Sequence, residues 1–73
     1  MRWTPVESGA FWAAGYAEGQ SWLYLLFRSG EVYRYFDVPR WRYQEFLAAD
    51  SKGGYFGRHI RGRFRYERVH RSR

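Results

Sequence analysis

The arginine-rich end of this chain is the feature most able to carry chemistry. Residues 58–73 contain seven arginines and one acidic residue, Glu67, and so account for the whole formal net charge of +6. Residues 1–57 contain six basic and six acidic side chains and are neutral. Because the planar guanidinium forms bidentate hydrogen bonds with phosphate, this segment predicts contact with a polyanion such as RNA or DNA.

Four of these arginines alternate with apolar residues that a folded domain would bury: Arg58, Arg61, Arg63 and Arg65. Residues 58 and 61 share a face of a helix, and residues 63 and 65 share a face of a strand. If both elements turn these faces to one side, the four guanidiniums line one groove. About five phosphate contacts give a slope of about −3.5 for log K against log salt on single strands. The alternative is a solvated face that only promotes solubility.

A second candidate group combines aromatic rings with an arginine: Trp22, Tyr24 and Arg34. Aromatic faces stack on unpaired bases while a guanidinium binds phosphate. Alternatively, a second copy of the chain covers this surface through Trp22, Tyr24 and Leu26, because exposed apolar patches commonly mark protein contacts. The sequence leaves both interpretations open.

The sequence predicts no catalytic or metal site. His59 and His70 are its only histidines, and it has no cysteine. Both histidines lie among cationic residues, which oppose the binding of a metal dication. Either histidine, with Tyr66 or an arginine, would serve a metal-independent ribonuclease, which is the less favoured alternative. The Lys-Gly-Gly run at residues 52–54 lacks phosphate-loop spacing and predicts a turn between helices. We therefore expect a non-catalytic protein without a cofactor.

These candidates must be positioned by a small α+β domain. We expect an antiparallel sheet of three to four strands packed against one main helix and one short helix. Alternating or continuous apolar residues predict strands over residues 11–16, 22–27, 31–36 and 63–69, and helical periodicity predicts helices over 40–50 and about 55–61, the second capped by Ser51. Residues 1–5 form an N-terminal segment, 6–69 the domain and 70–73 a basic tail.

The loop between the second and third predicted strands decides which side chains share a face. A three-residue loop over residues 28–30, with Gly30 left-handed, places Leu25 opposite Tyr33 and Leu23 opposite Tyr35. A two-residue loop would move every side chain of the third strand to the other face. We favour the three-residue loop because it gathers Leu23, Leu25, Phe27, Tyr33 and Tyr35 on one face and leaves Arg34 with Trp22, Tyr24 and Leu26 on the other. Tyr33 and Tyr35 are then core residues rather than a stacking platform for bases.

The composition indicates an aromatic core without covalent support. Aromatic residues make up 23% of the 73 residues, and there are no cysteines to form disulfides. No apolar run has the length of a signal peptide or approaches the ~20 residues that cross a bilayer. We expect a cytoplasmic protein that does not associate with membranes.

The order and spacing of short motifs across residues 6–69 resemble the KTSC domain family. The matching positions are Ser8, Gly15-Tyr16, Phe27, Gly30, Val32-Tyr33-Arg34-Tyr35, Val38-Pro39, Tyr43, Leu47-Ala48-Ala49, Ser51, Gly53, Tyr55-Phe56 and Ile60. The family takes its name from the C-terminus of some lysyl-tRNA synthetases and also occurs as free-standing small bacterial proteins. The resemblance implies an RNA-binding module without an established reaction.

Together, these features predict a non-catalytic module that binds RNA, tRNA included, through phosphate contacts. The contacts are assigned to Arg58, Arg61, Arg63 and Arg65, with Arg34 and Trp22 extending the surface. The main alternative is a protein-interaction module that self-associates through the face formed by Trp22, Tyr24 and Leu26.

Overall fold

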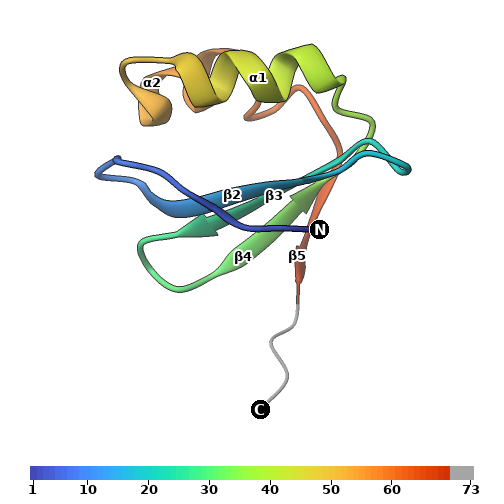
Figure 1. Cartoon of the computed structure of the whole chain (residues 1–73), viewed down its shortest axis with the longest axis horizontal. Coiled ribbons are helices and arrows are strands. Elements are labelled where there is room, and N and C mark those ends of the chain that lie inside the picture. Colours follow the sequence, from blue (N-terminus) through green and yellow to red (C-terminus); the bar gives the residue numbers. More distant parts are fainter. Residues whose placement is uncertain (70–73) are drawn as a thin grey trace.

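The computed structural model describes residues 1–69, which form one antiparallel sheet covered on one face by two helices (Figure 1). The elements are β1 (Thr4–Pro5), β2 (Phe11–Ala17), β3 (Trp22–Phe27), β4 (Val32–Tyr35), α1 (Arg40–Ala48), α2 (Lys52–His59) and β5 (Tyr66–Val69). The strands follow the order β1-β2-β3-β4-β5 in the sheet. The predicted α+β class is confirmed, although the sheet has five strands in residues 1–69 rather than three to four. The predicted basic tail, residues 70–73, lies outside the described residues.

The two edge strands differ from the prediction. Strand β1 pairs Thr4 with Ala14 and Pro5 with Ala13, so the sheet extends into the predicted N-terminal segment. Two residues that include a proline show no alternation from which a strand is recognised. Strand β5 begins at Tyr66 rather than at residue 63, because residues 60–63 form a turn in which Gly62 has a φ of 76°.

The hairpin between β3 and β4 has the predicted three-residue loop. The Phe27 N–H donates to the Glu31 carbonyl at 2.9 Å, and Gly30 has a left-handed φ of 97°. Leu23 lies opposite Tyr35 and Leu25 opposite Tyr33, as predicted. This register places Leu23, Leu25, Tyr33 and Tyr35 on the face that the helices cover.

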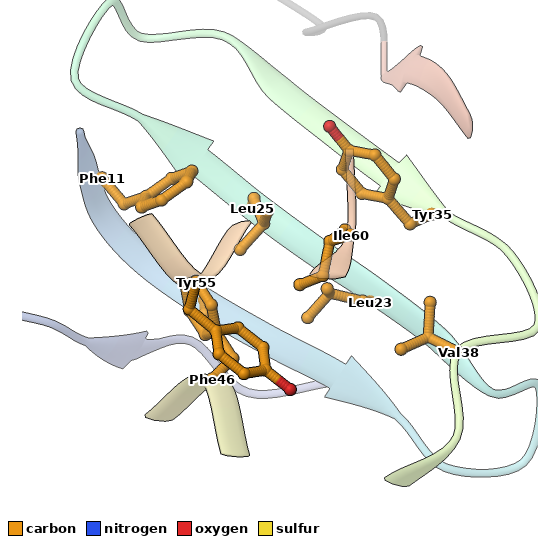
Figure 2. Packing of buried hydrophobic residues seen from close by; sticks show 9 residues of the cluster. Phe11, Leu23, Leu25, Tyr35, Val38, Phe46, Tyr55 and Ile60 are labelled. Atoms are coloured by element: carbon orange, nitrogen blue, oxygen red, sulfur yellow. The ribbon is translucent and has the colours of Figure 1, made fainter. Parts of the chain in front are cut away.

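The core fills the space between this face and the helices (Figure 2). Leu23 and Leu25 from the sheet, Phe46 from α1 and Ile60 after α2 are completely buried. Tyr35 is 4% exposed and belongs to the core as predicted, whereas Tyr33 is half-buried at its edge. Side-chain packing on one face of the sheet therefore holds the two layers together.

Helix α2 is capped at its start, and a side-chain network links it to α1. The Ser51 hydroxyl accepts a hydrogen bond from the Gly54 N–H at 3.0 Å, which confirms the predicted cap. Helix α2 nevertheless begins at Lys52, so residues 52–54 are its first turn rather than a turn between helices. The Tyr55 hydroxyl donates to the Glu45 carboxylate at 2.6 Å and accepts from the Arg42 guanidinium at 3.1 Å. In residues 1–69, neither helix is sufficiently long and apolar to cross a membrane.

Candidate nucleic-acid interface

The arginine-rich segment connects α2 to β5. Arg58 lies near the end of α2, Arg61 and Arg63 lie in the following turn, and Arg65 immediately precedes β5. All four residues are exposed. The Arg63 Nε donates to the Arg58 carbonyl at 3.1 Å, which ties the turn to the end of the helix.

Contacts with the core and sheet hold this segment in place. Ile60 is completely buried, and Phe64 packs against the core cluster. The Phe36 N–H donates to the Arg65 carbonyl at 2.9 Å, which aligns the segment with the end of β4. The arginines are therefore carried by an ordered connection rather than by a loose loop.

The acidic side chains that form ion pairs in residues 1–69 have other partners. The pairs are Arg34–Glu67, Arg40–Glu18, Arg42–Glu45 and Arg68–Glu31. Within the same residues, none of Arg58, Arg61, Arg63 and Arg65 forms an ion pair. Four guanidiniums near one end of the sheet thus remain uncompensated.

These four arginines do not line one groove. The Arg61 side chain lines a hollow on the helix-covered side, beside Tyr35. The Arg65 guanidinium instead lies 4.9 Å from the centre of the Phe36 ring, and Phe36 lies on the opposite face of the sheet beside Trp22. Arg61 and Arg65 therefore lie on opposite sides of the sheet, and residue 63 belongs to a turn rather than to the predicted strand.

The sheet face that no helix of residues 1–69 covers is called the open face (Figure 1). Arg34 and Trp22 lie together on it. The Arg34 guanidinium is 4.6 Å from the centre of the Trp22 ring and donates to the Tyr24 hydroxyl at 3.1 Å. It also pairs with Glu67 of β5, and this hydrogen bond is the main reason that the pKa of Arg34 is raised. The positive charge of Arg34 is thus already compensated.

The proposed self-association residues occupy the same open face. Trp22, Tyr24 and Leu26 are each half-buried rather than fully exposed. The ring of Trp3 packs edge-on against Tyr24 at 6.4 Å between centroids. The N-terminal segment and Arg34 therefore cover part of this aromatic surface.

A hollow of about 240 Å³ between the β4–β5 edge and the end of α2 was not anticipated from the sequence. It is lined by Phe27, Glu31, Tyr33, Tyr35, Phe56, Arg61, Gly62 and Tyr66. The sequence predicts Tyr66 in a strand over residues 63–69, but no local pattern indicates which strand lies beside it. Only the pairing of β5 with β4 brings the three tyrosines together.

His59, the histidine within the described residues, is not part of a cluster of polar side chains. The His59 ring packs against Tyr55, with 4.6 Å between ring centroids. No group of three histidine, cysteine or acidic side chains within residues 1–69 is arranged to hold a metal ion. His70, the other histidine considered as a general base, lies outside the described residues, as do Arg71 and Arg73.

Comparison with known proteins identifies the family. The sequence pattern of the KTSC domain matches residues 7–64. The chain belongs to the KTSC domain family. A crystal structure of a KTSC domain protein from Yersinia pestis superposes with a TM-score of 0.92, at 32% sequence identity, covering 94% of this chain and 97% of that one.

Relatives of this KTSC domain occur in two settings. A protein of Tsukamurella paurometabola is 41% identical over 61 residues, covering 84% of this chain and 91% of the relative. Lysine–tRNA ligases of Trichormus variabilis and Nostoc sp. are each 47% identical over 47 residues, covering 64% of this chain and 8% of each ligase. The KTSC domain thus spans a small part of those two enzymes.

Proposed function

We propose that this KTSC domain is a non-catalytic RNA-binding module. The observation that carries the proposal is the set of four exposed arginines without an ion-pair partner in residues 1–69. Free guanidiniums displace counterions from a phosphate backbone, which is a major source of affinity for nucleic acids. The similarity to a segment of two lysine–tRNA ligases favours RNA, tRNA included, over DNA.

The phosphate contacts are assigned to Arg58, Arg61, Arg63 and Arg65. Trp22 and Arg34 extend this surface onto the open face. Phe36 connects the two parts, because its ring contacts both Arg65 and Trp22. Because Arg34 is paired with Glu67, we expect it to contribute less than the four free arginines. Four contacts predict a slope of about −2.8 for log K against log salt on single-stranded RNA.

Binding of labelled bulk tRNA and of matched single-stranded RNA and DNA, each over a salt series, tests this function. The variant replaces Arg58, Arg61, Arg63 and Arg65 together by Gln and should abolish most of the salt dependence. A control variant lowers the net charge equally by replacing four basic residues outside the segment by Gln: Arg2, Arg28, Arg40 and Lys52. Equal losses in the two variants, or wild-type binding that disappears for RNA and DNA alike at physiological salt, would overturn the proposal.

Self-association through the open face is a second candidate. It is favoured by the absence of any helix over this face in residues 1–69 (Figure 1). Trp22, Tyr24 and Leu26 are half-buried there and thus remain partly accessible. Static light scattering tests it: a stable dimer that dissociates on Trp22→Glu supports an interaction module. A monomer at high concentration would contradict it.

Metal-independent RNA cleavage that is lost on His59→Ala would instead support the ribonuclease alternative.

A further inference from the structure

The hollow beside β5 has the size of a site for one ring system. Its volume of about 240 Å³ lies below the roughly 300–1,000 Å³ of pockets that enclose drug-sized ligands. The rings of Tyr33, Tyr35 and Tyr66 lie along it, with centroids 5.5–6.4 Å apart. Phe56 of α2 also lines it and packs edge-on against Tyr35, with 5.7 Å between ring centroids. A flat aromatic molecule matches this lining better than an aliphatic one.

Tyr66 differs from two exposed tryptophans of this chain, Trp12 and Trp41. The Arg28 guanidinium covers the ring of Trp12 at 3.9 Å, and the Arg42 guanidinium covers Trp41 at 4.3 Å. Tyr66 is 58% exposed, and no cation within residues 1–69 stacks on its ring. Its neighbours in the hollow hold the ring while its surface remains available for stacking.

Charged groups at the two sides of the hollow define what it would accept. Arg61 lines the hollow without an ion-pair partner in residues 1–69. The Glu31 carboxylate also lines it, and is held by the Arg68 guanidinium at 2.7 Å. Because a carboxylate has about four lone-pair positions, Glu31 retains capacity to accept further hydrogen bonds. An acceptor at Glu31 and a cation at Arg61 suit a ligand whose aromatic ring has an amino group on one side and an anionic group on the other.

We propose that this hollow is a subsite for one unstacked base of single-stranded RNA, with cytosine preferred to uracil. The base stacks on the exposed ring of Tyr66, and Arg61 contacts the adjoining phosphate. The cytosine amino group donates to Glu31, whereas uracil presents an acceptor oxygen at the same position. The inference rests on the proposed RNA-binding function, to which it adds the recognition of a base.

The test compares oligocytidine and oligouridine of equal length over a salt series, with wild-type protein and two variants. Tyr66→Ala removes the stacking surface from an exposed position of an edge strand, so the fold should persist. Loss of one stacked base should weaken oligocytidine binding roughly 5- to 150-fold and leave the salt slope unchanged. The control is Trp41→Ala, which removes an equally exposed ring from α1 and should leave binding unaltered.

Glu31→Gln separates base recognition from stacking. We expect it to remove the preference for oligocytidine while retaining Tyr66-dependent affinity. Wild-type affinity of Tyr66→Ala, with loss of binding in the four-arginine variant, would overturn the subsite but leave RNA binding intact. If wild-type protein binds neither oligonucleotide, the proposed function fails. Titration with cytidine monophosphate, followed by NMR of the tyrosine rings, then tests the hollow alone, and unchanged ring signals would overturn it.

Discussion

The Arg34 guanidinium on β4 pairs with the Glu67 carboxylate on β5, directly across the strand ladder. Glu67 is the single acid among the last sixteen residues, and its partner comes from the neutral part of the chain. Because Glu67 is occupied by Arg34, this carboxylate does not neutralise one of the neighbouring arginines. This pairing leaves the four arginines before β5 as the free cationic surface.

Glu67→Gln should strengthen RNA binding and steepen the salt slope by about 0.7, because it frees the charge of Arg34. The free energy of unfolding should fall by no more than about 1 kcal/mol, since the Glu67 side chain is 48% exposed. Fluorescence anisotropy over a salt series and urea denaturation measure the two effects. Glu7→Gln is the matched control, because it changes the net charge equally at an exposed residue before β2. Equal gains in both variants would mean that only the overall charge matters.

Gly30→Ala should destabilise the protein by about 1–2 kcal/mol. Gly30 has a φ of 97°, and a Cβ added there would meet no atom within 4 Å, so the cost is backbone strain rather than a clash. Gly19→Ala is the control, because Gly19 is equally open but has no positive φ. Urea denaturation of both variants gives the difference. A cost at Gly19 as large as that at Gly30 would contradict this explanation.

Tyr55→Phe should lower the free energy of unfolding by about 1–2 kcal/mol, because the hydroxyl links charged groups of α1 to α2. RNA affinity should not change, since Tyr55 lies on the side of α2 that faces α1. Tyr43→Phe provides the comparison: this tyrosine stacks on Tyr16, and its hydroxyl has no hydrogen-bond partner within residues 1–69. Thermal unfolding of both variants decides whether the Tyr55 hydroxyl is the cause.

Stability should fall as the pH rises above about 10. Burial raises the pKa of Tyr35 above its ordinary value, with smaller contributions from Tyr66 and Tyr33. In this range the unfolded chain has lost the Tyr35 proton while the folded chain retains it, so proton release favours unfolding. Urea midpoints at several alkaline pH values should show the fall, and Tyr35→Phe should make it shallower. Tyr24→Phe, on the open face, should leave the alkaline fall in stability unchanged.

Much of the central fold follows from local patterns in the sequence. The run from residue 22 to 27, the loop ending in Gly30 and the alternation around Tyr33 determine the β3–β4 hairpin and its register. The Ser51 cap and the segregation of charge are also visible locally. They can be predicted because turn conformation, side-chain alternation and helix capping depend on residues that are close in the chain.

The tertiary structure decided which distant residues meet. The pairing of β5 with β4 commits Arg34 to Glu67, gathers three tyrosines around a hollow and divides Arg61 and Arg65 between the two sides of the sheet. Strand β1 exists because Thr4–Pro5 lies beside β2, although its own sequence carries no strand pattern. These features depend on contacts across long loops, whose partners no local propensity encodes. The sequence therefore determined the charge, the hairpin and the family motifs, while long-range pairing decided how the arginines and aromatic rings are combined into a surface.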